Sequence, residues 1–494
     1  MAVKKIGVGL IIIGTLGIAS SILVAFLLRT KADIQSIQIF CIEISVIIFL
    51  IGLWLTLAKI TEDIQPRKQI QNLVDRILNL PTITWVLISF LFVYFRTFIV
   101  PVFLNSDLQM RYFAGYVPNL VPIGNDLSVM IDQIKAWVAT NQSPYLVQFY
   151  PPLTYILFAP LLLIKDYLTL YRLFTIFTFF NYCLLTLLLP LKIIDKKNYS
   201  LALLFFLIGL LSYGFQFEIE RGQYNIFTFL LCIFSIYIFH YHRKYRLIAY
   251  FLFSISIQLK LYPAIFIFMF VDDWRDWKNV ILRFVGIGLF NFILFFAMGY
   301  QIFWDFIHSV TAQMINPSWL GAWNHSISSF VDTIKLDGLG LIDLDTLRVL
   351  RHNSGWIEAF LLLVFIILFI SNLIIFYLRK ESGLDPYLLL ACTIGAMVLP
   401  ISYDYKLSIL TVPMLLFLCE ISEMKNIWRK FISILLILGI SLAYSSTLIP
   451  YKYRPYYLNN IFPSLFLILI LATLSNFMRY KDSKVQAIEN KSAA

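Results

Sequence analysis

Residues 123–164 read IGNDLSVMIDQIKAWVATNQSPYLVQFYPPLTYILFAPLLLI, and this stretch decides how the rest of the chain is interpreted. Its first half repeats apolar residues at the i, i+3, i+4, i+7 spacing of one helix face. The members of that face are Leu127, Met130, Ile131, Ile134, Trp137 and Val138. The spacing predicts an amphipathic helix that begins at Asp126 and ends before Pro144, because the residue before a proline disfavours the α region. Such a helix is too polar to span a bilayer and apolar enough to lie on one.

The composition indicates a polytopic, all-α membrane protein. Of the 494 residues, 60% are hydrophobic and only 14% are charged, whereas a soluble chain carries about 25% charged residues. The net charge of +11 favours anionic lipid surfaces and phosphate-bearing substrates. Nucleic acid is not an expected partner, because the chain has no basic stripe outside its membrane loops.

Long apolar runs predict about fourteen transmembrane helices. They are Ile6–Leu28, Ile37–Ile60, Ile83–Phe103, Pro151–Ile164, Leu170–Ile193, Leu201–Phe217, Tyr224–Phe239, Leu247–Val271, Asn279–Gly299, Trp356–Tyr377, Leu384–Ser402, Leu407–Glu420, Phe431–Leu448 and Ile461–Met478. We divide the chain into a two-helix hairpin with a cytoplasmic linker at 1–82, a membrane module at 83–478 and a disordered cytoplasmic tail at 479–494.

Lys4 and Lys5 set the orientation of the chain, because basic residues near the first span favour the inner side. Counting spans from there places two large loops, 104–150 and 300–355, on the outer side. The basic loops Lys192–Lys197 and His240–Arg246 also count as outer, against the positive-inside rule. A re-entrant segment at Pro151–Ile164 would reverse every side after it.

Asp126 is the first candidate for chemistry. A carboxylate at the start of an interfacial helix, between two membrane segments, can act as a base on a lipid-borne substrate. The structural alternative is a helix N-cap, for which aspartate is among the best residues. Asp107, just after the third predicted span, is the runner-up, and its alternative is a solvated carboxylate at the membrane boundary.

Metal and nucleotide chemistry find little support in the sequence. The five cysteines lack CxxC spacing, so neither a disulfide framework nor a metal site is expected. Asp343-Leu-Asp345 has the Asp-x-Asp form associated with nucleotide-sugar enzymes, but a single such motif in a loop is a weak metal signal. The sequence contains no Gly-rich phosphate loop and no His/Glu metal spacing. We expect no cofactor and leave metal dependence open.

Several short motifs, in this order along the chain, resemble those of glycosyltransferase family 87. They are Asp126-Leu-Ser-Val, Ser143-Pro-Tyr145, Tyr150-Pro-Pro-Leu153, Gly222-Gln223-Tyr-Asn225, Lys260-Leu-Tyr-Pro263, Trp323-Asn324-His325-Ser326 and Pro400-Ile-Ser-Tyr-Asp404-Tyr. The resemblance covers roughly Ile83 to Met478 and leaves the first two predicted spans as an addition.

The resemblance implies a GT-C helical bundle that uses a polyprenyl-phosphate sugar as donor. A mannosyl-like hexose or an arabinofuranosyl-like pentose would pass to a lipid or glycan acceptor on the outer face of the cell membrane. A lipid phosphate leaves without strong protonation, so one carboxylate suffices as the base in a single inverting displacement. Glycoside hydrolysis differs, because it normally uses two carboxylates.

Polar residues at these motifs and in the outer loops complete the predicted site. His325 is a candidate to assist the base or bind the donor, with an interfacial histidine as its alternative. Candidates for donor and phosphate binding are Lys260, Arg221, Gln223, Asn225, Lys406 and Arg454. Candidates for lining the substrate cavity are Tyr145, Tyr150, Asn324 and Asp404.

Two of these candidates have strong structural alternatives. Lys260 falls near the middle of the predicted span Leu247–Val271, where a charge indicates function by default. It could instead pair with Glu218 or Glu220. Arg221 counts as inner, opposite Asp126, and this position favours a structural role.

Two other classes of protein fit the same composition. A transporter of lipid-linked glycans would also need basic and aromatic cavity residues, but it would not depend on one carboxylate. A membrane glycan polymerase or ligase would depend more on arginines in the outer loops.

Overall fold

The computed structural model describes residues 124–145, 149–210, 212–315, 324–337, 352–379, 383–399, 402–422, 435, 439 and 461–493. The first three predicted spans, and with them the hairpin and linker of 1–82, lie outside the described residues. So does nearly all of the predicted span Phe431–Leu448. The division of the chain at residue 82 therefore stays a prediction.

The described part of the chain is helical, apart from an isolated antiparallel β-bridge between Asn324 and Tyr403. In chain order the elements are α6 (Asn125–Thr140), α7 (Pro152–Phe158), η3 (Ala159–Leu163), α8 (Tyr167–Cys183), η4 (Leu184–Leu188), α9 (Pro190–Ile193), η5 (Lys196–Asn198), α10 (Tyr199–Leu210), α11 (Tyr213–Arg221), α12 (Asn225–Tyr241), η6 (Arg243–Tyr245), α13 (Arg246–Leu259), η7 (Tyr262–Met269), α14 (Trp277–Leu294), α15 (Tyr300–Ile315), α16 (Ile327–Asp337), α18 (Ser354–Arg379), α19 (Pro386–Val398), η9 (Asp404–Leu410), α20 (Thr411–Ser422) and α23 (Phe462–Ala493). The element η4 is a π-helix, and the other η elements are 3₁₀ helices. The predicted all-α class is confirmed for these residues.

Four helical segments in the described ranges are long and apolar enough to cross a membrane. They are Tyr167–Ile193, Trp277–Leu294, Ser354–Arg379 and Phe462–Lys481, each of which contains most of a predicted span. The pair α10 and α11, bent by 50°, would be a fifth. Other predicted spans correspond to shorter helices, such as α12 with 17 residues and α19 with 13. These segments support a membrane protein, but they do not confirm the count of fourteen.

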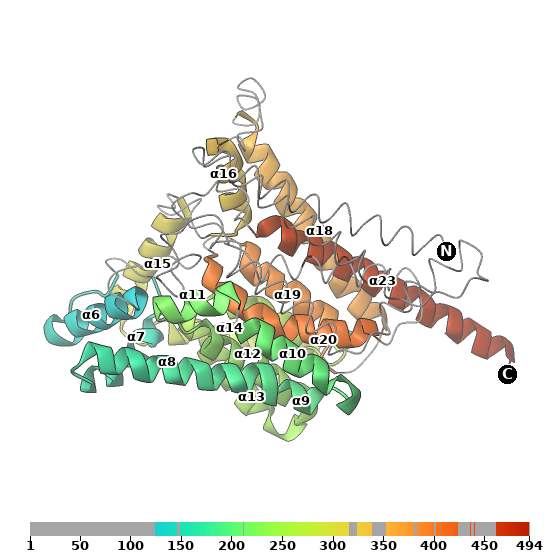
Figure 1. Cartoon of the computed structure of the whole chain (residues 1–494), viewed down its shortest axis with the longest axis horizontal. Coiled ribbons are helices and arrows are strands. Elements are labelled where there is room, and N and C mark those ends of the chain that lie inside the picture. Colours follow the sequence, from blue (N-terminus) through green and yellow to red (C-terminus); the bar gives the residue numbers. More distant parts are fainter. Residues whose placement is uncertain are drawn as a thin grey trace, which may run out of the picture.

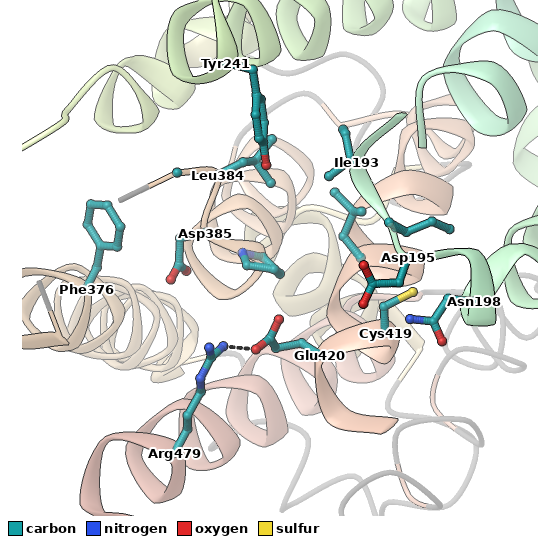
Figure 2. A pocket seen from close by; sticks show the side chains of 14 residues that line it. Ile193, Asp195, Asn198, Tyr241, Phe376, Leu384, Asp385, Cys419, Glu420 and Arg479 are labelled. Carbon is teal, nitrogen blue, oxygen red and sulfur yellow. Dashed lines mark ion pairs between the residues drawn. The ribbon is translucent and has the colours of Figure 1, made fainter. Parts of the chain in front are cut away.

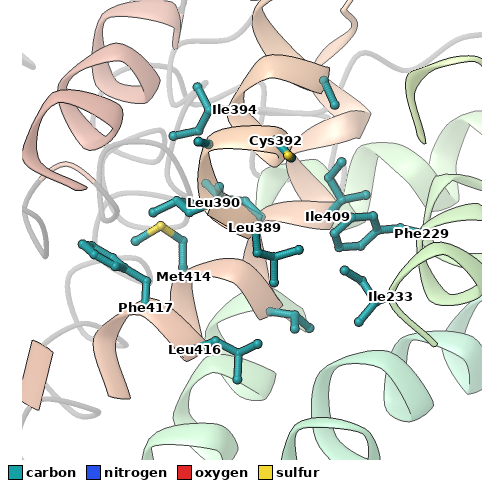
Figure 3. Close-up of a cluster of buried hydrophobic side chains, with 14 of the residues drawn as sticks. Phe229, Ile233, Leu389, Leu390, Cys392, Ile394, Ile409, Met414, Leu416 and Phe417 are labelled. Atoms are coloured by element: carbon teal, nitrogen blue, oxygen red, sulfur yellow. The ribbon is translucent and has the colours of Figure 1, made fainter. Parts of the chain in front are cut away.

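The centre of the bundle is formed by α19, whose residues 387–398 are all buried. Its sequence is apolar on every side, as is typical of a helix enclosed by protein. Figure 3 shows side chains from α12, η9, α19 and α20 meeting there, among them Phe229, Leu389, Ile409 and Phe417. Because other helices cover α19, its length need not match the thickness of a bilayer.

The predicted amphipathic helix is confirmed as α6, but its apolar face packs on protein. Four of the predicted face residues are fully or almost fully buried against α7 and α8: Leu127, Met130, Ile131 and Ile134. Val138 is 59% exposed and does not belong to that face. The helix ends at Thr140, before Pro144 as predicted, and its end is set by Asn141, which takes a left-handed conformation with φ 55°. Packing on protein therefore explains an apolar stripe that we attributed to the bilayer surface.

The predicted span Leu247–Val271 is wrong, because the chain turns back within it. Helix α13 ends at Leu259, and Lys260 is extended with φ −150° and ψ 143°. The 3₁₀ helix η7 then returns, so that Arg246 before the turn forms an ion pair with Asp272 after it. The run is apolar throughout, so hydropathy alone shows one span where the structure has two short passes.

Pro151–Ile164 is also not a complete span, since α7 has 7 residues and η3 has 5. Helix α8 begins beside α6, where the Tyr167 hydroxyl donates to the Gly124 carbonyl at 2.7 Å. In Figure 1, α6 lies at the left end and α8 runs from below it towards the right. The span count thus contains one span too many at Pro151–Ile164 and one pass too few at Leu247–Val271. Each error reverses the side assigned to the loops that follow it, so the assigned sides are correct again after the second error.

The loops between these two errors lie on the side opposite to the one that the span count gave. Arg221 lies beside Asp126, with which it forms an ion pair. Lys192–Lys197 and His240–Arg246 lie at the other end of the bundle, which we call the far end. A cavity of about 270 Å³ opens there, and Figure 2 shows Asp195, Tyr241 and Arg479 around it. The basic loops Lys192–Lys197 and His240–Arg246 thus lie at the same end of the bundle as Arg379 and Arg479. The positive-inside rule expects basic loops to share one side of the membrane in this way.

The far end is tied together by two ion pairs, Arg379 with Asp385 and Arg479 with Glu420. The second joins α23 to α20 across the cavity wall (Figure 2). Helix α23 continues through Ala493 and so includes residues 479–493 of the predicted tail. Lysine, glutamate, glutamine and alanine in that segment have high helix propensity.

The revised topology predicts which loops share a side of the membrane. Single cysteines at Gln142, Lys196 and Lys244, in a cysteine-free background, should fall into two classes with a membrane-impermeant thiol reagent. Positions 196 and 244 should behave alike, because both lie at the far end, and position 142 should behave oppositely. Labelling of 142 together with either of the others in intact cells would contradict this arrangement.

Gly214 in α11 allows η9 to approach closely. A Cβ at this position would lie 2.7 Å from Leu407 Cβ and 2.8 Å from the backbone nitrogen of Ser408. Gly214→Ala should therefore lower the free energy of unfolding by about 1–3 kcal/mol, the usual cost of overpacking. Gly286→Ala in α14 is the control, because nothing lies within 4 Å of that Cβ. Thermal unfolding in detergent should separate the two variants, and equal midpoints would count against this packing.

Candidate active site

Asp126 is positioned by a close contact between the start of α6 and the end of α11. The backbone N–H of Gly124 donates to the Glu220 carbonyl at 2.8 Å. Gly124 and Gly222 both have positive φ, at 72° and 66°. A Cβ on Gly222 would lie 2.8 Å from Leu127 Cβ, so only glycine fits between the two helices. The Gly222-Gln223 motif is therefore needed at this contact for its backbone shape.

The carboxylate of Asp126 lies between two side chains of that contact. Its Oδ1 is 2.7 Å from Nη2 of Arg221, and its Oδ2 accepts a hydrogen bond from Nε2 of Gln223. Asp126 is the second residue of α6, and the N-cap position is Gly124. The N-cap alternative is therefore wrong, and so is the placement of Arg221 on the opposite side of the membrane.

Gln223 connects Asp126 to Lys260. Its Nε2 faces Asp126 and the Tyr150 hydroxyl, at 3.2 Å from the latter, while its Oε1 accepts from Nζ of Lys260 at 2.5 Å. Gln223 is 1% exposed and Lys260 is 7% exposed. An amide with one donor end and one acceptor end can bridge an anion and a cation in this way.

Aromatic rings surround the ammonium group of Lys260. Nζ lies 4.7 Å from the ring centroid of Tyr224, 5.1 Å from that of Tyr405 and 5.4 Å from that of Tyr150. Ring faces stabilise a desolvated cation without neutralising it. Glu218, which we considered as an ion-pair partner, accepts instead from the backbone of Ile226 at 2.8 Å and from the Ser408 hydroxyl. It caps α12 and acts on Lys260 only as a nearby charge.

His325 and Asp404 form a second polar group, in the late loop. Nδ1 of His325 lies 3.1 Å from Oδ1 of Asp404, and the Tyr213 hydroxyl donates to Oδ2 of Asp404 at 3.0 Å. The backbone N–H of His325 donates to the Ser402 carbonyl at 2.9 Å. Asn324 accepts on Oδ1 from the backbone N–H groups of Ser326 and Ser402. Asn324 is therefore structural, because it joins the two loop segments.

The two polar groups belong to one site, because residues 403–406 reach from one to the other. Burial and then the charge of Asp126 raise the pKa of Tyr403, the neighbour of Asp404, to about 12. Tyr405 faces Lys260. Burial lowers the pKa of Lys406 to about 7, and the positive charge of Lys260 contributes to this shift. Lys260 and Lys406 are thus close enough for their positive charges to repel each other when both are protonated.

The remaining predicted residues fall into three groups. Tyr145 supports the site from outside: its hydroxyl donates to the Tyr150 carbonyl at 2.9 Å, and its ring packs on Phe306 of α15. Asn225 is fully buried at the start of α12, where its carbonyl accepts from Tyr262. Asp107 and Arg454 lie outside the described residues.

Sequence reasoning missed Tyr213, Tyr224 and Tyr405. The last two lie inside motifs that we quoted, so their aromatic character was a usable signal. No signal in the sequence pointed to Tyr213, because it contacts Asp404 across a separation of 191 residues. In the described ranges, groups of three or more His, Cys, Asp or Glu side chains suited to a metal ion are not found.

The model of glycosyltransferase family 87 matches residues 149–402. No curated protein and no solved structure matches the chain. The matched range contains Tyr150, Arg221, Gln223, Lys260 and His325. It begins after Asp126 and ends before Asp404, which the fold brings to the same site.

Proposed function

The chain belongs to glycosyltransferase family 87, and we propose that it transfers a sugar from a polyprenyl-phosphate donor to a hydroxyl of a lipid or glycan acceptor. The sugar is a mannosyl-like hexose or an arabinofuranosyl-like pentose. The observation that carries the proposal is the contact between Asp126 and Lys260 through Gln223. This contact brings a carboxylate and an ammonium group within one side chain of each other, an arrangement suited to a displacement at a lipid-linked phosphate.

Asp126 acts as the base in this proposal. It takes the proton of the acceptor hydroxyl while the acceptor oxygen attacks the anomeric carbon of the donor. The bond between that carbon and the phosphate oxygen breaks, and the lipid phosphate leaves with the bonding electrons. Arg221 contacts one oxygen of the carboxylate and Gln223 donates to the other, so the orientation of the carboxylate is set before substrate binds.

Lys260 faces the donor phosphate in this proposal, and Lys406 lies near it. A cation held by tyrosine rings and one amide keeps its charge available for an anion. An anionic group between Lys260 and Lys406 would relieve their mutual repulsion, and it would stabilise the negative charge that develops on the leaving phosphate. Arg221 is committed to Asp126, so it contributes to the base more than to the phosphate.

The basic loops support a site on the outer side of the cell membrane. Lys192–Lys197, His240–Arg246 and the Arg379 end of α18 lie opposite Asp126 across the bundle. Basic loops favour the cytoplasmic side. The Asp126 end then faces outward together with α6 and α15, and Trp304 of α15 is 40% exposed there.

Asp126→Asn tests the base. The variant should insert into the membrane, and transfer from polyprenyl-phosphate mannose or arabinofuranose in proteoliposomes should fall about 100- to 10,000-fold. Lipid-linked glycans in cells that carry the variant, measured by mass spectrometry, should match those of cells without the protein. Asp107→Asn is the control and should transfer at nearly the normal rate. An inactive Asp107 variant beside an active Asp126 variant would move the base to Asp107, and normal transfer by both would favour the transporter alternative.

Lys260→Met tests the phosphate contact. Loss of one charge-assisted interaction should weaken binding of the polyprenyl-phosphate sugar about 10- to 100-fold. Lys278→Met is a matched control, because Lys278 is exposed in the far-end segment that follows Asp272. Binding is measured with the purified proteins in nanodiscs. Unchanged donor affinity together with reduced insertion would assign Lys260 a structural role.

A further inference from the structure

The fully buried ring of His325 has one nitrogen in use and one without a partner. Nδ1 contacts Asp404, whereas Nε2 is fully buried and makes no hydrogen bond within the described part of the chain. A buried polar atom without a partner costs about 1–3 kcal/mol. An unpaired buried nitrogen calls for an explanation, and contact with a bound substrate is one that a polar site supports.

The chemistry of the pair defines what that group can be. Asp404 is a carboxylate that already accepts from Tyr213, so the hydrogen of the 3.1 Å contact belongs to Nδ1 of His325. Burial lowers the pKa of His325, and the contact with Asp404 offsets this only in part. The ring is therefore neutral at neutral pH, and its Nε2 carries no hydrogen.

A nitrogen without a hydrogen can accept a hydrogen bond but cannot donate one. Phosphate oxygens are acceptors too, so they do not satisfy Nε2. A hydroxyl group does. In the proposed reaction the acceptor hydroxyl that reacts pairs with Asp126, and the donor sugar brings further hydroxyl groups into the site.

We propose that His325 reads the donor sugar by accepting a hydrogen bond from one of its hydroxyl groups on Nε2, and that Asp404 and Tyr213 are positioning residues that hold the ring in the accepting form. The proposal rests on the function proposed above. It separates two tasks within the site: Lys260 faces the phosphate that all donors share, and His325 faces the sugar that distinguishes them.

The hydrogen bond from Tyr213 determines which atom of an asparagine at position 404 would face His325. Tyr213 donates to Oδ2, so in Asp404→Asn the amide oxygen would turn to Tyr213 and the amide NH₂ to His325. The NH₂ would donate to Nδ1 and move the ring hydrogen to Nε2. The nitrogen that accepts from the sugar would become a donor, although no atom of the site would have moved far.

The test compares two lipids that carry the same charge. Binding to the protein in nanodiscs is measured for the polyprenyl-phosphate sugar, with mannose and with arabinofuranose, and for methyl polyprenyl phosphate, a phosphodiester without a sugar. The dissociation constant of methyl polyprenyl phosphate divided by that of the polyprenyl-phosphate sugar is the preference ratio. A higher ratio means stronger recognition of the sugar, because both lipids share the phosphate and the polyprenyl chain. Lys260→Met should weaken both lipids and leave the ratio unchanged.

His325→Ala and Asp404→Asn should each lower the ratio about three- to tenfold, the worth of one hydrogen bond. His325→Gln should retain part of the preference, because its amide oxygen can accept. Adding Tyr213→Phe to Asp404→Asn should restore part of the ratio, because the asparagine is then free to turn its oxygen to His325. A purely structural role for Asp404 predicts the reverse, a double variant worse than either single variant.

The outcomes separate this inference from the proposed function. A wild-type protein that binds neither lipid would overturn the proposed function, and the inference with it. Binding of both lipids without preference for a sugar would overturn the inference alone. So would a preference that survives His325→Ala in a protein with normal thermal unfolding, or a double variant that recovers nothing.

Discussion

The ammonium of Lys260 is the charge that the Asp126 end of the molecule must accommodate. A charge removed from water is costly unless polar or aromatic groups face it. Gln223 and three tyrosine rings supply those groups. Gln223 also donates a hydrogen bond to Asp126, and Asp126 forms an ion pair with Arg221. These side chains come from α6, α11, η9 and the segments next to α7, α12 and α13. Removing any one of them leaves a buried partner unsatisfied, so the arrangement is cooperative.

Helix α11 sets the spacing between the two polar groups of the site. Tyr213 at its start holds Asp404, and Arg221 at its end holds Asp126. Eight residue steps along an α-helix span about 12 Å. Phe217 lies between them, stacked on Tyr213 and within 5.9 Å of the Arg221 guanidinium. Gly214 and Gly222 bring η9 and α6 against this helix, so a short, rigid element fixes how far Asp126 lies from the late loop.

Irregular backbone occurs where the side chains of the candidate site lie. Lys260 is in an extended break between α13 and η7, and Asp404 and Lys406 are in the first turn of the 3₁₀ helix η9. Broken helices at membrane depth are tolerated only where protein or a polar cavity satisfies the exposed backbone groups. The enclosing helices provide that cover, and the breaks turn side chains into the site that a continuous helix would direct elsewhere.

The sequence by itself determined the membrane class, the extent of the amphipathic helix after Asp126 and the motifs that carry Gln223, Lys260 and His325. These are local properties: hydropathy and helix periodicity depend on neighbouring residues, and a motif is read in a single stretch. Only the tertiary structure decided that Arg221 lies beside Asp126, that Leu247–Val271 turns back on itself and that Tyr213 holds Asp404. An apolar run has the same hydropathy whether the chain continues or reverses within it, and charges pair by distance in space, which the order of residues along the chain does not record.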